Sequence, residues 1–426
     1  MNISEQARRM KLDSSKLAAT SKEQRNKALL AISEALVAKK ESILAANVED
    51  MEAAKEAGIA TPILKRLKFD NKKLEDVVSG IHELINLPDP VGKVEFEREL
   101  DQSLTLVRET CPIGVIGVIF EARPDAMVQI SSLCIKSGNC AILKGGSEAM
   151  KTNKALFTTI FEAAIGAGMP EASLFQVEAR EDINELLSCH ESVDLIIPRG
   201  SNSFVRYIMD HSKIPVMGHA DGICHVYADK NADIDKSIAV IVDAKIQYVA
   251  VCNAAETLLV HEAIAPKLLP PLKEALEAKN VEIRGTKEVQ DIISCHSAEE
   301  NDFATEYLDY IISIKIVNNM EEAIDHINRY GSHHTDCILT EDKEAAKHFM
   351  MLVDSAGVYQ NCSTRFADGF RYGFGAEVGV STGKLHARGP VGLDGLVTYK
   401  YKLFGDGHIV ADYAEGRKQF HFKEIR

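Results

Sequence analysis

The sequence lacks the features of a membrane-spanning, secreted or nucleic-acid-binding protein. It contains no run of 18 uninterrupted apolar residues, so a spanning helix is excluded. The first 15 residues contain no apolar h-region, so we expect no secretory signal. Lys and Arg number 49 against 63 Asp and Glu, which gives a formal net charge of −14. This deficit of cations disfavours binding to nucleic acids and to anionic lipid surfaces.

Disulfide and zinc-finger patterns are also absent. The nine cysteines are an odd number, form no CxxC pair and show no zinc-finger spacing. In an acidic chain of 426 residues this usage favours free thiols in a reducing cytoplasm. Hydrophobic residues make up 46% and charged residues 26%, which is typical of a folded chain. A prior of about 150 residues per domain predicts two or three domains. We therefore expect a globular, cytoplasmic enzyme.

The first 110 residues change from a helical to an extended pattern. Apolar residues recur at helical spacing through residues 1–87, and Ser21 with Gln24 fits a capping box at a helix start. From 91 to 110 charged residues alternate with Val, Phe and Leu. This alternation predicts a hairpin or a pair of arms rather than a core strand.

An alternation of strands and helices begins at Gly114. The apolar runs 114–120 and 140–146 are typical of strands that are buried on both faces, and helical patterns follow each of them. A second alternating series starts near residue 233. This order of elements predicts an α/β fold with parallel sheets and right-handed crossovers.

Two glycine-containing turns follow strands of the first series. Lys144-Gly-Gly-Ser147 ends one strand and opens a helix, and Pro198-Arg-Gly-Ser201 occupies the equivalent place further along. Backbone N–H groups at such turns favour an anion, and the lysine adds a positive charge for a nucleotide phosphate. The alternative is an ordinary strand-to-helix turn in which Ser147 is the N-cap residue, and the pattern leaves both interpretations open.

Cys252 is the most favourable candidate for a nucleophile. It ends an apolar run in a segment predicted to be non-helical, and Asn253-Ala-Ala255 leaves room for a ligand. A thiolate there can attack an acyl carbon. Cys224 and His225 are less suitable, because neighbours in a strand point to opposite faces. A buried and inert role for Cys252 remains open at this point.

A histidine group lies further along the chain, at His326, His333 and His334. Metal ligation calls for side chains on one helix face or on facing strands, usually with carboxylates. His333 and His334 are adjacent, so their side chains should diverge. We therefore expect no metal site, and either substrate contact or a structural role for these residues.

Four longer stretches carry a resemblance to a known family. They are FEARPDA (120–126), SGNCAILKGGSEA (137–149), VNNMEEAIDHINRYGSHHTDCI (317–338) and the segment from NCSTRFADGF to GPVGL (361–393). Through them the chain resembles, nearly end to end, the gamma-glutamyl phosphate reductase family, a proline-biosynthesis branch of the aldehyde dehydrogenase superfamily. The resemblance implies an aldehyde-dehydrogenase-like α/β fold, with a Rossmann-type parallel-sheet cofactor domain, a second α/β catalytic domain and a small β arm.

The resemblance also implies roles for individual residues. Cys252 matches the catalytic cysteine of the superfamily. The contacts to NADPH are implied to come from the lysine turn, a glycine-serine pair under the pyrophosphate and a glutamate on the nicotinamide ribose: Lys144, Gly145, Gly146, Ser147, Gly200, Ser201 and Glu306. The residues implied to lie near the substrate are Arg123, His334, Asn361 and Arg365.

One departure from the superfamily pattern bears on the chemistry. Aldehyde-oxidising members of the superfamily carry a general-base glutamate in a segment just before the cysteine. The matching segment of this sequence, Pro215-Val-Met-Gly-His219, contains no glutamate. Without that base, water should attack an acyl-enzyme poorly. This suits an enzyme whose acyl group is exchanged with phosphate.

The activity implied is the NADPH-dependent reduction of L-glutamyl 5-phosphate to L-glutamate 5-semialdehyde, with release of phosphate, through a cysteine thioester. The alternatives are another acyl-phosphate or semialdehyde reductase of the superfamily, or a metal- or nucleotide-binding regulatory protein that uses the His326–His334 group. The resemblance also implies a homo-oligomer and leaves open a contact with glutamate 5-kinase.

Three structural parts are expected by analogy with the superfamily. They are an NADPH-binding domain of residues 1–93, 111–226 and 354–386, a catalytic domain of residues 227–353, and an oligomerisation arm of residues 94–110 and 387–426.

Overall fold

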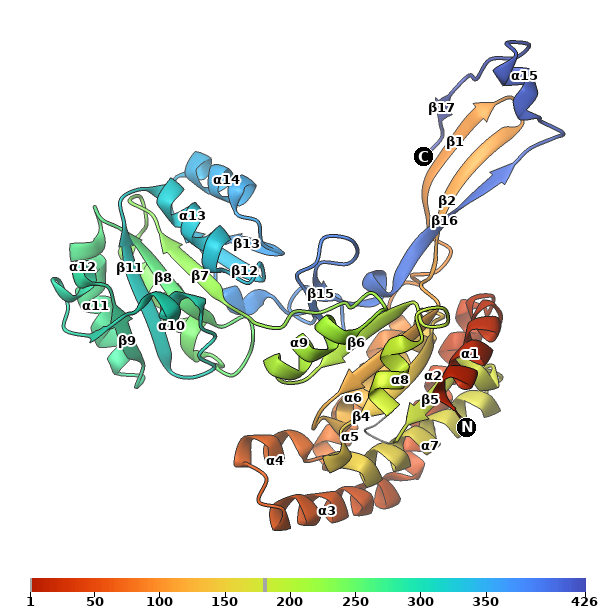
Figure 1. Cartoon of the computed structure of the whole chain (residues 1–426), viewed down its shortest axis with the longest axis horizontal. Coiled ribbons are helices and arrows are strands. Elements are labelled where there is room, and N and C mark those ends of the chain that lie inside the picture. The colour runs from red at the N-terminus through yellow and green to blue at the C-terminus, as the bar shows by residue number, and fades with distance from the viewer. Residues whose placement is uncertain (1, 179–181) are drawn as a thin grey trace. The chain divides into compact units, whose positions relative to one another are not determined.

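The computed structural model describes residues 2–178 and 182–426, and the chain forms two compact units (Figure 1). Each unit is continuous in space but not in sequence, since the C-terminal part of the chain contributes to both. Unit 1 consists of Met1–Met217, Phe374–Gly379 and Val391–Arg426, and unit 2 of Gly218–Gly373 and Val380–Pro390.

Unit 1 begins with a layer of helices. The capping box predicted at Ser21 and Gln24 is present at the start of α2, and an Asp70 side chain caps α5. Leu29 and Ile32 of α2 are fully buried, and α2 packs against α5 and α7. The helices are α1 (Ile3–Ala18), α2 (Lys22–Ala38), α3 (Lys40–Glu56), α4 (Thr61–Leu67), α5 (Asn71–Asn86), α6 (Pro124–Lys136), α7 (Met150–Gly166), α8 (Asp182–Ser188), α9 (Asn202–His211) and α15 (Val410–Ala414).

A parallel sheet lies against these helices, with the strand order β5-β4-β3-β6. Its strands are β3 (Val115–Phe120), β4 (Cys140–Gly145), β5 (Leu174–Val177) and β6 (Leu195–Arg199). Every residue of β3 and β4 is buried, as the apolar runs predicted. Phe120 is in register with Gly145 on one side and Arg199 on the other, so three strands end at one level. Because the chain goes from β3 to β4 and later returns to the far side of β3, the switch point of this sheet lies at the carboxyl ends of β3 and β6.

The extended segment predicted for residues 91–110 is an antiparallel hairpin in a second sheet of unit 1. This sheet has the order β16-β2-β1-β17 and consists of β1 (Val94–Asp101), β2 (Leu104–Pro112), β16 (Val397–Phe404) and β17 (Lys423–Glu424). We refer to these four strands as the arm. Two further strands, β14 (Gly379–Ser381) and β15 (Gly389–Val391), pair with each other where the chain passes between the units.

Unit 2 is built on a seven-stranded sheet with the order β10-β9-β11-β8-β7-β12-β13, and all of its strand pairs are parallel. The strands are β7 (Cys224–Ala228), β8 (Ala255–His261), β9 (Glu282–Gly285), β10 (His296–Ser297), β11 (Ile311–Val317), β12 (Thr335–Leu339) and β13 (Gly357–Gln360). The helices between them are α10 (Ile234–Ile246), α11 (Ala265–Glu277), α12 (Lys287–Gln290), α13 (Met320–Tyr330) and α14 (Lys343–Leu352).

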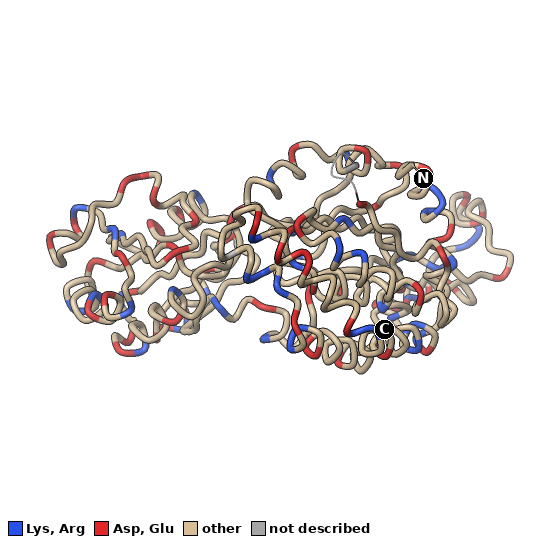
Figure 2. The backbone as a smooth tube through the Cα atoms, turned by 90° about the horizontal axis from the view of Figure 1, so that it is seen from below, with Lys and Arg blue, Asp and Glu red and all other residues tan. Residues whose placement is uncertain are grey.

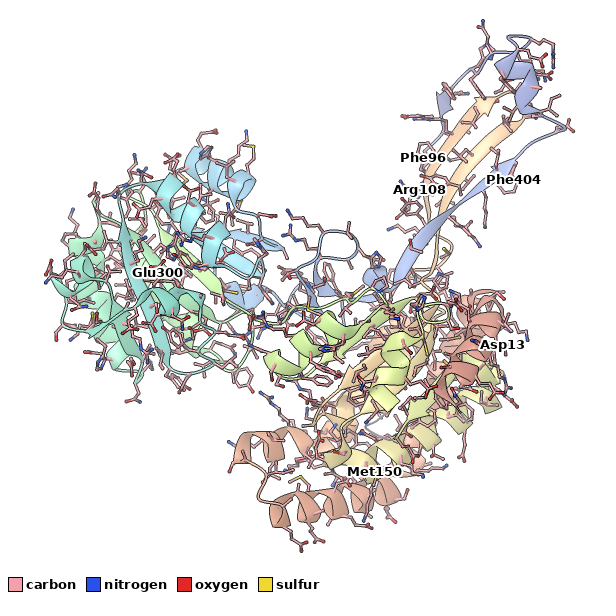
Figure 3. The ribbon with its side chains drawn as sticks, in the orientation of Figure 1. Asp13, Phe96, Arg108, Met150, Glu300 and Phe404 are labelled. Carbon is pink, nitrogen blue, oxygen red and sulfur yellow. The ribbon has the colours of Figure 1, made fainter. Side chains whose placement is uncertain are left out.

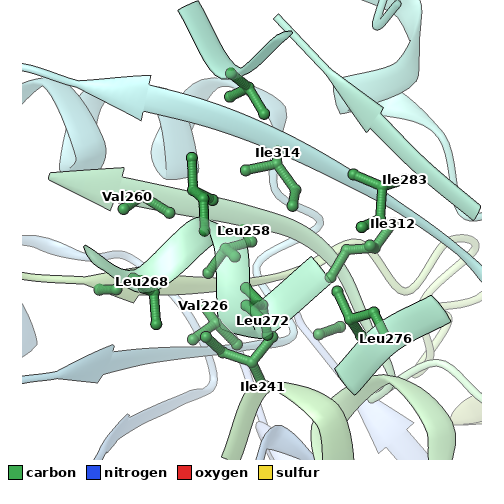
Figure 4. Packing of buried hydrophobic residues seen from close by; sticks show 14 of the residues in the cluster. Val226, Ile241, Leu258, Val260, Leu268, Leu272, Leu276, Ile283, Ile312 and Ile314 are labelled. Carbon is green, nitrogen blue, oxygen red and sulfur yellow. The ribbon is translucent and has the colours of Figure 1, made fainter. Parts of the chain in front are cut away.

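The two faces of this sheet have separate apolar cores, because successive strand residues alternate between the faces. Val226 and Leu258 pack with Ile241 of α10 and Leu272 of α11 on one face (Figure 4). On the other face the strand neighbours Tyr227, Leu259 and Ile338 pack with residues of α13 and α14. The strand residues of both cores are buried, which explains why the strand sequences are almost continuously hydrophobic.

Acidic and basic residues are intermixed along the chain in Figure 2. The net charge of −14 is therefore not confined to one segment of the tube. None of the helices in the described residues is long and apolar enough to cross a membrane.

The α/β fold with parallel sheets that the sequence predicts is confirmed. The boundaries of the compact units differ from those of the three parts expected by analogy. Residues 218–226, 354–373 and 380–386, which that scheme grouped with the cofactor domain, belong to unit 2 by their contacts, as do residues 387–390 of the expected arm. The division by role remains a prediction.

Candidate active site

Cys252 lies in unit 2 in a non-helical turn between α10 and β8, and it is half-buried. The Cys224 thiol donates to the Cys252 carbonyl oxygen at 3.2 Å. Gly222 passes so closely that a Cβ there would lie 2.2 Å from the same oxygen and 2.3 Å from the Cys252 Cα. Only a glycine at 222 permits this approach, so the backbone of the turn is held from two sides.

The segment after Cys252 is held by the loop that contains Arg365. The Asn253 side chain donates to the Ala367 carbonyl at 2.8 Å, and the Thr364 hydroxyl donates to the Asn253 carbonyl at 2.7 Å. Arg365 donates to the Asn253 side-chain oxygen and, at 2.9 Å, to the Gln247 side chain. Burial lowers the pKa of the Arg365 guanidinium. In this arrangement Arg365 braces the turn of Cys252, and its contact with substrate remains a prediction.

Two imidazoles lie beside the Cys252 sulfur. A ring nitrogen of His219, one of His334 and the Cys252 Sγ all lie within 4.8 Å of one another. The His219 Nδ1 is 2.9 Å from the Val380 carbonyl oxygen, which can only accept, so Nδ1 carries the proton and Nε2 has the free lone pair. His334 is fully buried, and its Nε2 has no hydrogen-bond partner in the described part of the chain. The rings meet edge to face at 4.9 Å.

His219 is the residue that sequence reasoning missed. It ends the segment Pro215–His219, for which the sequence predicts only that a general-base carboxylate is missing. No spacing rule relates residues 219, 252 and 334, because each precedes a different strand of the sheet. Parallel pairing of β7 with β8 and β12 is what brings their amino ends together.

The other histidines of the predicted group lie elsewhere. His333 Nδ1 lies 2.6 Å from the Asp354 carbonyl oxygen, whereas His334 Nδ1 lies 2.9 Å from the Thr335 hydroxyl, so the two adjacent side chains diverge as predicted. His326 is buried, with its ring packed against the rings of Phe303, Tyr330 and His225.

Buried His326 should make the stability of unit 2 depend on pH. Burial, with smaller effects from His225, Lys315 and Arg329, lowers its pKa from 6.5 to about 3. Between these values the unfolded chain binds a proton that the folded chain does not, so unfolding free energy falls as the pH falls below 6.5. From pH 7.5 to pH 5 this contribution is about 2 kcal/mol. We expect a His326→Met variant to lose that much of the pH dependence in urea unfolding.

The control for this measurement is His348→Gln, because His348 on α14 is about half-exposed (47%). Its variant should retain the pH dependence of the unmodified chain. Equal slopes for His326→Met and the unmodified chain would show that His326 takes up its proton without unfolding.

In unit 1, the predicted cofactor residues gather at the carboxyl edge of the β5-β4-β3-β6 sheet. Lys144 and Gly145 end β4, and Gly146 and Ser147 lead through a short 3-10 turn into α7. Lys144 is 4% exposed, and its ammonium group donates to the Gly145 carbonyl at 2.6 Å. A positive charge is thus held at the end of a strand next to the switch point.

Gly200 and Ser201 follow β6 at the same level. Ser201 precedes the first turn of α9, and its N–H donates to the Glu121 carboxylate at 2.9 Å. Ala122 donates its N–H to the Glu148 carboxylate at 2.5 Å. A Cβ at Gly200 would lie 2.4 Å from the Glu121 oxygen, so a larger residue there would displace the Glu121 side chain. The two carboxylates occupy the positions at which anionic oxygens of a ligand would accept hydrogen bonds from these N–H groups. This edge of the sheet therefore fits the phosphates of a dinucleotide.

The remaining predicted residues are placed as follows. Arg123 precedes α6 after β3, at the same edge of the unit 1 sheet. Glu306 is half-buried in unit 2 before β11. The Asn361 amide donates to the Thr340 carbonyl and accepts from the Thr340 N–H, each at 2.9 Å. Asn361 thus follows the carboxyl end of β13, whereas Cys252 and His334 precede the amino ends of their strands. Its amide is engaged with the main chain, and substrate contact by it remains a prediction.

Comparison with known proteins identifies the family of enzymes to which the chain belongs. The model of the "Aldehyde dehydrogenase family" matches residues 2–309, which is more than half of the chain. The chain therefore belongs to the aldehyde dehydrogenase family, and it is an oxidoreductase by that membership.

Its relatives narrow the assignment. A gamma-glutamyl phosphate reductase of Acetivibrio thermocellus is 60% identical over 420 residues, which cover 99% of this chain and 97% of that protein. The crystal structure of a gamma-glutamyl phosphate reductase from Thermotoga maritima is 40% identical, with a TM-score of 0.93 over 95% of this chain and 99% of that one. Within the aldehyde dehydrogenases, the chain thus belongs to the gamma-glutamyl phosphate reductase family.

A more distant structure shares the fold alone. An engineered glycolyl-CoA reductase with bound NADP+ is 14% identical and has a TM-score of 0.63, over 94% of this chain and 96% of that chain.

Proposed function

We propose that this chain reduces L-glutamyl 5-phosphate to L-glutamate 5-semialdehyde with NADPH, releasing phosphate, as a step of proline biosynthesis in the cytoplasm. The names of its relatives support the substrate, and one observation supports the chemistry. Cys252 is a half-buried thiol in a braced turn with two imidazoles around its sulfur. Among the described cysteines, the buried ones such as Cys134 and Cys337 lie in apolar surroundings, where burial raises their pKa to about 12.

The proposed reaction divides one displacement into two steps. The Cys252 thiolate attacks the acyl carbon of L-glutamyl 5-phosphate, a carbon–sulfur bond forms, and the bond to the phosphate oxygen breaks. The product of this step is a thioester and free inorganic phosphate. After reduction the thiohemiacetal collapses: the carbon–sulfur bond breaks, the aldehyde leaves, and Cys252 is regenerated.

NADPH, when bound, supplies the hydride that converts the thioester to the thiohemiacetal. The residues that would hold it are Lys144, Gly145, Gly146, Ser147, Gly200, Ser201 and Glu306. Lys144 contributes a buried cation, and the N–H groups at Ala122 and Ser201 contribute donors to oxyanions. Their present carboxylate partners, Glu121 and Glu148, would have to give way to phosphate oxygens.

The absence of a glutamate in Pro215–His219 supports phosphate over water as the exchange partner. A carboxylate there would take a proton from water and hydrolyse the thioester. Substrate contacts by Arg123, His334, Asn361 and Arg365 belong to the proposal, with His334 supported by its position beside Cys252.

The test runs the reaction in reverse, with purified enzyme, L-glutamate 5-semialdehyde, phosphate and NADP+. We expect NADPH to form only when phosphate is present, and more slowly with NAD+ or with other aldehydes. Equal rates without phosphate would contradict the acyl-phosphate chemistry. Faster turnover of another aldehyde would favour the alternative, a different semialdehyde or acyl-phosphate reductase.

We also propose that the arm joins copies of the chain into a homo-oligomer. Figure 3 shows the side chains of Phe96, Arg108 and Phe404 on the strands of the arm. On β16, Tyr401, Leu403 and Phe404 are each more than half-exposed. Exposed aromatic and leucine side chains on a sheet-edge strand favour a protein partner. Both the homo-oligomer and the kinase contact can be tested by measuring the mass of the protein in solution, first alone and then with glutamate 5-kinase.

A further inference from the structure

The group of Cys252, His219 and His334 has the composition of a metal site. One thiol sulfur and two imidazole nitrogens lie within 4.8 Å of one another, and all three residues belong to unit 2. We propose that these three side chains bind Zn²⁺, and that the bound ion reversibly blocks Cys252. The blocking part of this inference rests on the proposed function of Cys252, whereas the binding part does not.

The donor set selects the kind of ion. Thiolate and imidazole suit Zn²⁺, whereas Mg²⁺ and Ca²⁺ require oxygen ligands, and the group contains no carboxylate. Zn–S bonds of about 2.3 Å and Zn–N bonds of about 2.0 Å, at tetrahedral angles, place ligand atoms about 3.3–3.6 Å apart. The three atoms therefore need to close by at most about 1.5 Å, which side-chain rotation of half-buried Cys252 and His219 can supply.

Both imidazoles are prepared for ligation. The Val380 carbonyl fixes the tautomer of His219, because Nδ1 donates to it at 2.9 Å and leaves Nε2 as the ligand atom. Metal-binding histidines commonly use a carbonyl in this way. His334 is 0% exposed, and its Nε2 lacks a hydrogen-bond partner in the residues that the structure describes. A buried nitrogen without a partner costs free energy, and a metal bond would satisfy it.

Binding of the ion has a direct consequence for the sulfur. Cys252 loses its thiol proton to solvent when the Zn–S bond forms, and the metal-bound sulfur no longer attacks an acyl carbon. Three protein ligands leave one tetrahedral position for water or phosphate. The same ligation shields the thiolate from alkylation and oxidation, so release of the ion restores a reduced nucleophile.

The test uses Co²⁺ as a spectroscopic probe of the full chain, which is first freed of metals with a chelator under reducing conditions. We expect one equivalent of Co²⁺ to produce the visible bands of tetrahedral cobalt and an ultraviolet thiolate-to-cobalt band. One equivalent of Zn²⁺ should abolish both. Cys252→Ser should lose the thiolate band, and His219→Asn should weaken Co²⁺ binding at least about 100-fold. His334→Asn should do the same if it folds.

Cys295→Ser is the matched control, because Cys295 is also half-buried in unit 2 but lies outside this group, and its variant should keep both bands. No thiolate band in the unmodified chain would overturn the proposal, as would a band that survives in Cys252→Ser or is unaltered in His219→Asn. The spectra need no substrate. If the unmodified enzyme shows full reductase turnover but no cobalt bands, the metal site is refuted and the proposed function is left intact.

Discussion

Cys252→Ala should lose turnover by about 10⁴-fold or more, while its binding of NADPH stays nearly unchanged. The reason is that alanine cannot form the thioester, and neither imidazole beside the sulfur replaces it as the acyl carrier. The residues proposed to hold the phosphates of NADPH lie at the sheet edge of unit 1, so removing one sulfur from unit 2 leaves them untouched. Phosphate-dependent formation of NADPH from L-glutamate 5-semialdehyde measures the first effect, and a fluorescence titration with NADPH measures the second.

Cys295→Ala serves as the control for this experiment. It also removes a half-buried thiol from unit 2, but its sulfur lies near Gly285 and away from the Cys252 turn. Its turnover should match that of the unmodified chain. Turnover near the normal rate in Cys252→Ala would remove Cys252 from the mechanism, and a parallel loss in Cys295→Ala would point to a general effect of thiol removal on folding.

The elements of the fold could be predicted where local rules determine them. The run 114–120 contains no polar side chain because β3 is covered on both faces, and the Ser21 capping box needs only residues of its own turn. The turns at Lys144 and at Ser201 could also be placed at strand ends, because parallel strands all end at one edge of a sheet.

The candidate site in unit 2 depends on contacts between distant segments. His219, Cys252 and His334 precede three different strands, and only the order β8-β7-β12 makes them neighbours. Arg365 illustrates the same limit, because its guanidinium is bonded to Asn253 and Gln247, more than 100 residues earlier in the chain. Family resemblance indicates that such residues lie near the site, but the hydrogen bonds that they form can be identified only from the structure.

The second large effect, on the free energy of unfolding, is expected for a buried ion pair in unit 2. Lys245 of α10 and Glu256 of β8 are both fully buried, and their charged atoms are 2.5 Å apart. Burial lowers the pKa of Lys245 and raises that of Glu256, since each charge has lost water and has mainly the other for compensation. The Leu308 N–H, at 3.4 Å, adds a weak contact to the carboxylate.

Lys245→Met should lower the free energy of unfolding at pH 7.5 by about 3–5 kcal/mol, because it leaves Glu256 buried without its partner. The carboxyl group then stays protonated in the folded chain but ionises in the unfolded chain. With a folded pKa raised above the unfolded value of about 4.3, the native state holds the extra proton, so stability falls as the pH rises above that value. In the unmodified chain the pKa of Glu256 is already raised to about 7, so below that pH the carboxyl is protonated in both folded chains. The deficit should therefore shrink as urea unfolding is measured from pH 7.5 down through pH 7 and should change little at lower pH.

Two further variants separate loss of pairing from loss of packing. Lys245→Met with Glu256→Leu fills the same volume without a buried charge, so its stability should return close to that of the unmodified chain and show no added pH dependence. Lys236→Met removes a lysine from the same helix, but its pair with Glu341 is exposed, at 61% and 50%, so we expect no measurable change. If the double variant were as unstable as Lys245→Met alone at every pH, the lysine would matter through its aliphatic contacts, and the ion pair would not be the source of the loss.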